Sequence, residues 1–81
     1  TAGGIFRLQF ATEEPVAEEE IARLHPLRTQ RQGRLCVLTI KGNKDEALKE
    51  AKAWNPSFIE VLPLSLEEVF ILEMEELGYA K

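Results

Sequence analysis

The chain has 81 residues, of which 44% are hydrophobic and 30% are charged, and its formal net charge is −4. This composition is typical of one small globular domain, and it excludes a disordered chain and a two-domain enzyme with a cleft between the domains. No apolar run approaches the roughly 18–20 residues of a membrane-spanning helix, and no signal peptide is recognisable. Because the sequence begins with Thr1 rather than Met, we expect residues 1–81 to be a single domain taken from a longer protein.

Charges of opposite sign are segregated along the chain. Residues 23–52 carry a net charge of +5, whereas residues 1–22 carry −4 and residues 53–81 carry −5. We expect the acidic ends to fold back beside the basic middle. A nucleic-acid-binding function is disfavoured, because aromatic residues for base stacking are absent from the basic segment.

Hydrophobic periodicity predicts a mixed fold. Phe6, Leu8 and Phe10 alternate with polar residues and would share one face of a strand, and the continuous apolar run 35–40 is typical of a central strand. We expect strands near residues 4–11, 27–32, 34–41 and 57–62, and helices near residues 14–24, 43–54 and 65–77. The second strand is polar and is expected at an edge of the sheet.

Capping residues set the expected ends of the helices. Thr12 is expected to cap the first helix and Asn43 the second. Ser65 and Glu68 have the spacing of a capping box at the start of the third helix, and Gly78 is its expected terminator. The order β-α-β-β-α-β-α predicts an α+β fold, a ferredoxin-like βαββαβ antiparallel sandwich with an additional C-terminal helix.

Residues that carry chemistry are scarce. The lone Cys36 lies in an apolar run and is expected to be buried, and the lone His25 precedes a proline at a helix end. No glycine-rich phosphate loop is present, and the loop after the first strand is acidic where an acylphosphatase-like enzyme would hold phosphate. We therefore expect no catalytic, cofactor-binding or metal-binding residue in this chain.

The third helix has more apolar residues than one face needs. At about 100° per residue, five of them fall on one face: Leu66, Val69, Phe70, Met74 and Leu77. We expect this face to pack on the body of the domain, with Phe70 as the largest contributor. Ile71 and Leu72 fall outside it and are the expected interface with a partner surface.

Residues 62–75 carry a family resemblance. The run Leu66-Glu67-Glu68-Val69-Phe70 resembles the LEE(V/I)F motif that closes a small accessory domain in the ATP-binding subunits of bacterial ABC transporters. Such domains also tend to begin with a short strand similar to residues 4–8. The resemblance covers the whole chain in its order of elements, but only residues 62–75 make it specific.

The resemblance implies a non-catalytic regulatory or dimer-stabilising domain of an exporter ATPase. ATP and magnesium are implied for the rest of that protein alone, since Walker A, signature and Walker B motifs are all missing here, and we expect this chain neither to bind nor to hydrolyse ATP. The implied partners are the nucleotide-binding domain of the same chain, a membrane permease subunit and a second copy, at the cytoplasmic face of the membrane. The alternative is a free-standing ligand-sensing module similar to the amino-acid-sensing domains.

Overall fold

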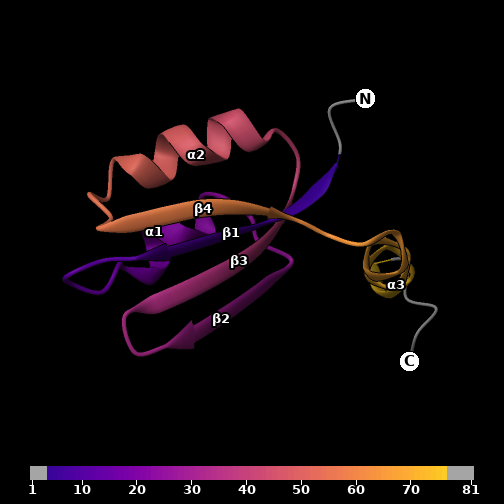
Figure 1. The fold of residues 1–81 in the computed structure, drawn as a ribbon, viewed down its shortest axis with the longest axis horizontal. Coiled ribbons are helices and arrows are strands. Elements are labelled where there is room, and N and C mark those ends of the chain that lie inside the picture. Colours follow the sequence, from indigo (N-terminus) through magenta and orange to yellow (C-terminus); the bar gives the residue numbers. More distant parts are fainter. Residues whose placement is uncertain (1–3, 77–81) are drawn as a thin grey trace.

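Residues 4–76 are described by the structure, a computed structural model (Figure 1). The strands are β1 (Ile5–Ala11), β2 (Arg28–Gln32), β3 (Leu35–Lys41) and β4 (Phe58–Pro63). The helices are α1 (Glu18–Ala22), α2 (Lys44–Lys52) and α3 (Leu66–Glu76). The predicted order of elements is confirmed, and each strand boundary lies within one residue of its expected position.

The four strands form one antiparallel sheet in the order β2-β3-β1-β4. This order, with α1 and α2 as the connections, gives the expected α+β ferredoxin-like sandwich with an additional C-terminal helix. The polar β2 lies at an edge and the apolar β3 lies inside the sheet. Gly33 begins the two-residue turn between them with a φ of 62°, a left-handed value that glycine adopts without steric cost.

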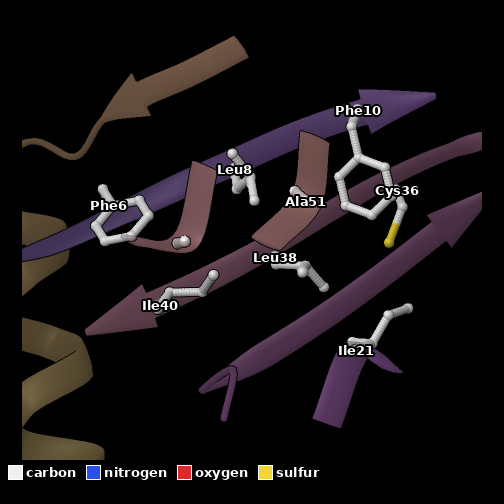
Figure 2. Close-up of a cluster of buried hydrophobic side chains, with 9 residues drawn as sticks. Phe6, Leu8, Phe10, Ile21, Cys36, Leu38, Ile40 and Ala51 are labelled. Carbon is white, nitrogen blue, oxygen red and sulfur yellow. The ribbon is translucent and has the colours of Figure 1, made fainter. Parts of the chain in front are cut away.

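The core lies between the sheet and the helices α1 and α2. Figure 2 shows the side chains of Phe6, Leu8 and Phe10 directed toward those of β3 and α2. The buried cluster consists of Phe6, Leu8, Phe10, Ile21, Cys36, Leu38, Ile40, Ala47 and Ala51. Because Ile21 belongs to α1 while Ala47 and Ala51 belong to α2, both helices cover the same face of the sheet. The opposite face is called the open face below.

Helix α1 is shorter than predicted, and the expected cap at Thr12 is wrong. The Thr12 hydroxyl donates a 2.6 Å hydrogen bond to the carbonyl of Glu14 instead of capping a helix, and its side chain is buried. The chain bends at residues 13–14, and Ala17, which is extended, precedes the helix without a side-chain cap. A local side-chain turn at Thr12 therefore delays the helix until Glu18.

The other cap expectations hold where they can be checked. The Asn43 side chain accepts hydrogen bonds from the amides of Asp45 (2.9 Å) and Glu46 (3.2 Å) and so caps α2. Both α1 and α2 are followed by a left-handed residue and then a proline, with φ of 51° at His25 and 56° at Asn55. Gly78, the expected terminator of α3, lies outside the described residues.

Two ion pairs between residues distant in the sequence join the basic middle of the described chain to its acidic ends, as the charge pattern predicts. Arg34 lies 3.8 Å from Glu13, and Arg28 lies 2.6 Å from Glu75. Neither pair is buried, so each contributes little to the free energy of unfolding on its own. Within residues 4–76, no helix is both long enough and apolar enough to cross a membrane.

Candidate functional site

Two ion pairs join helix α3 to the sheet. Glu68 Oε2 accepts a 3.0 Å hydrogen bond from Arg7 of β1, and Glu75 Oε1 accepts a 2.6 Å hydrogen bond from Arg28 of β2. Because Phe6 and Leu8 point into the core, the alternation of a strand places Arg7 on the open face. Figure 1 shows α3 at the end of the sheet where β1 begins and β3 ends.

The geometry of the two pairs fixes the direction of α3. The register places Arg7, Thr39 and Arg28 side by side in one row across β1, β3 and β2. The two arginines are thus two strands apart, about 10 Å. Glu68 and Glu75 are separated by about 10.5 Å along the helix axis. Helix α3 therefore crosses the strands steeply, and Figure 1 shows it end-on while the strands run across the page.

Leu72 is the apolar side chain between the two pairs. At about 100° per residue, Glu68, Leu72 and Glu75 lie within about 60° of one another around the helix. This stripe is called the docked face of α3. Leu72 is only 8% exposed, and Ile5 and Thr39, which belong to the open face of the sheet, are also buried. The docked face therefore covers the end of the open face.

The first turn of α3 is closed by the predicted capping box. The Ser65 hydroxyl accepts a 3.1 Å hydrogen bond from the Glu68 amide, and the Ser65 amide donates a 3.1 Å hydrogen bond to Glu68 Oε1. The hydrogen bond from the Ser65 amide, supported by the Arg7 guanidinium, holds the pKa of Glu68 below its ordinary value. Glu68 thus has two tasks, because it caps the helix and attaches it to β1.

The expected packing face of α3 is wrong for its two most exposed residues. Leu66 is 86% exposed and Phe70 is 64% exposed, so neither packs on the body of the domain, and Phe70 is not the largest contributor. Val69 and Met74 are half-buried, and Leu77 lies outside the described residues. Leu66 and Phe70 stay outside because α3 turns its other side, which carries Glu68 and Glu75, toward Arg7 and Arg28 of the sheet.

The two residues expected at an interface have different environments. Ile71 is 46% exposed, so its side chain is accessible to a partner. Leu72 is buried within the chain itself, which contradicts its expected place in an interface. Neither composition nor periodicity predicted a role for Arg7, Arg28 and Glu75. The spacing of Glu68, Leu72 and Glu75 was a usable signal, because it places all three on one helix face.

The side of α3 that faces away from the sheet presents an apolar surface, called the outer face below and defined by Leu66, Val69 and Phe70. Leu66 and Phe70 are four residues apart and therefore neighbours on the helix surface. A shallow hollow lies over this face, and it is lined by these three residues together with Glu67 and Glu73. Exposed apolar side chains gathered on one helix are typical of a surface that binds another protein.

Two other features of the described residues concern chemistry, namely the thiol of Cys36 and the side chains that could bind a metal. Cys36 is buried and is one of the residues that line a small hollow of about 60 Å³, and burial raises the pKa of its thiol, which disfavours the reactive thiolate. No cluster of His, Cys, Asp and Glu side chains in residues 4–76 could hold a metal ion. The outer face of α3, where Leu66 and Phe70 are exposed, is the candidate functional site.

Comparison with known proteins adds no relative: the chain matches no protein-family model, no curated protein and no solved structure.

Proposed function

We propose that this chain is a non-catalytic accessory domain that associates with another protein surface through the outer face of α3. The observation that carries the proposal is the exposure of Leu66 and Phe70 on a helix that is attached to the sheet by its opposite side. A helix attached in this way has a fixed orientation. Its apolar side chains are therefore presented to a partner without a large cost in conformational entropy.

The resemblance of residues 62–75 suggests the setting in which this association occurs. In this proposal the chain is the C-terminal domain of an ABC exporter ATPase, and it regulates or stabilises the assembled transporter. Its partners are the nucleotide-binding domain of the same protein, a second copy of it or a membrane permease subunit. ATP and magnesium bind elsewhere in the protein, which works at the cytoplasmic face of the membrane.

The proposal is tested first on the complete reading frame and then on the complete protein. A P-loop ATPase sequence before Thr1 is expected, and its absence would remove the transporter assignment. In the complete protein, Leu66→Ser combined with Phe70→Ser is expected to reduce transport without changing the thermal stability of the domain. Phe58→Ser is the matched control, because Phe58 is 42% exposed but lies on β4, away from α3.

Ligand sensing is the second candidate function. A groove of about 720 Å³ lies beside α2, and its lining includes Arg23 and Leu24, which follow α1, together with Asn43 and Glu46. A small molecule with both charges, such as an amino acid, would suit this mixed lining. The test is an amide-shift titration of the chain with the common amino acids. Saturable shifts confined to the groove would support sensing, and shifts absent at millimolar concentration would exclude it.

A further inference from the structure

We propose that the partner of the outer face of α3 is a protein surface with an apolar centre and a rim of Lys or Arg side chains. This inference rests on the proposed function, because it gives the chemistry of the partner that the accessory domain binds. It is carried by the charges around the outer face, which distinguish such a surface from the α3 of a second copy and from a membrane.

The apolar part of the outer face supplies the driving force for association. Leu66 and Phe70 are largely exposed, and Val69 is half-buried beside them. Covering these side chains removes apolar area from water, which is the dominant favourable contribution in protein association. Since Leu66 and Phe70 lie outside the core, their substitution should not disturb it, and the contribution of this surface to binding can be measured separately from folding.

The acidic part of the outer face sets the sign of the partner's charge. Residues 66–76 include five glutamates and no basic residue. Glu68 and Glu75 are paired with arginines of the sheet. Glu67 and Glu73 line the outer hollow, and neither makes an ion pair with any residue in the described part of the chain. Two uncompensated carboxylates beside an apolar surface favour a partner with a basic rim.

The same charges disfavour the two other occupants. If a second copy placed its α3 against this one, Glu67 and Glu73 would face the equivalent glutamates, and like charges that meet across an interface repel. If the outer face lay on a membrane, its carboxylates would approach an anionic surface, whereas helices that bind there carry Lys and Arg on their polar side. An apolar protein surface with basic residues avoids both repulsions.

The test uses two synthetic amphipathic helical peptides with the same leucine stripe. One peptide has Lys at the flanking positions and the other has Glu. Each is titrated into the full chain while amide shifts are followed by NMR. The Lys peptide is expected to saturate with its largest shifts at Leu66, Phe70 and Glu73. It is expected to bind at least about ten-fold more tightly than the Glu peptide at low salt, and this preference should shrink as salt is added.

Variants separate the apolar and the charged contributions. Phe70→Ser is expected to weaken binding of both peptides. Glu67→Gln combined with Glu73→Gln is expected to remove the preference for the Lys peptide. Glu60→Gln is the matched control, because Glu60 is an exposed glutamate on β4, and it should leave the preference unchanged. Circular dichroism of each variant verifies that α3 is intact.

Three results would overturn the inference. The first is equal binding of the two peptides, and the second is a shift map centred on the glutamates of α1 instead of α3. The third is self-association or binding to phosphatidylserine vesicles that Phe70→Ser abolishes, because a second copy or a membrane would then be the occupant. These results are independent of the transporter assignment. A Lys preference mapped to α3 would stand even if no ATPase precedes Thr1.

Discussion

Replacing Leu72 by Ala should weaken the attachment of α3 to the sheet while leaving the rest of the domain folded. Leu72 is 8% exposed and is the apolar contact between the two ion pairs of the docked face. Burying a leucine side chain contributes about 1.5–3 kcal/mol, whereas each exposed ion pair contributes about 0.2–1 kcal/mol. The substitution should therefore remove the larger part of the attachment, about 2 kcal/mol.

This loss should be confined to α3. A cost of about 2 kcal/mol corresponds to an opening equilibrium for the helix that is about thirty-fold more favourable. Native-state amide hydrogen exchange measures that equilibrium residue by residue. In Leu72→Ala, protection of the α3 amides should fall by about this factor, while the amides of β1 and β3 should keep theirs.

Phe70→Ala is the matched comparison, because Phe70 is larger than Leu72 but 64% exposed. Its effect on exchange and on thermal unfolding should stay within about 0.5 kcal/mol. The reasoning is refuted if Phe70→Ala costs more than Leu72→Ala. It is also refuted if Leu72→Ala accelerates exchange equally throughout the sheet, since α3 would then be part of one cooperative core.

Three further predictions concern the charges and caps. Arg28→Gln removes the ion pair with Glu75 and should lower the free energy of opening of α3, measured by amide exchange, by about 0.2–1 kcal/mol. An equal effect in 1 M salt would contradict an electrostatic origin. Because the pKa of Glu68 is lowered in the folded chain, its stabilising contribution is fully present above the unfolded-state pKa and is lost as the pH falls through the folded-state pKa. The protection factors of the amides at the start of α3, which compare each exchange rate with its intrinsic rate at the same pH, should therefore fall in acid. Glu68→Gln should abolish that pH dependence of protection, and a persisting dependence would assign it to another group. Asn43→Ala removes the cap of α2 and should lower the free energy of unfolding by about 1 kcal/mol in thermal melts, while Asn43→Gly should cost only a few tenths, and equal costs would argue against a side-chain cap.

The fold could be predicted from the sequence because its signals are local. The alternation of Phe6, Leu8 and Phe10 predicts a strand with one buried face, and the spacing of Ser65 and Glu68 predicts the start of α3. Each of these signals depends on residues that lie within a few positions of one another. Each segment therefore contains the residues that determine its own secondary structure.

The orientation of α3 could not be predicted in the same way. Counting apolar residues favours the side with Leu66 and Phe70 as the buried one. The choice is made instead by Arg7 and Arg28, which are distant in the sequence and become neighbours of Thr39 only when the sheet has formed. The ion pairs between α3 and the sheet thus decide which side of the helix faces inward. The apolar outer face stays exposed and becomes the candidate site.

The strand order also has a consequence for the route by which the chain folds. The hairpin of β2 and β3 closes through a two-residue turn, and such hairpins form in about 1–10 μs. In contrast, β1 is hydrogen-bonded on both sides to strands that are far from it in the sequence. The entropy of closing those long loops is lost before the contacts form, which makes the insertion of β1 between β3 and β4 the slow step. Helix α3 can attach only afterwards, because the row of side chains that holds it spans β1, β3 and β2.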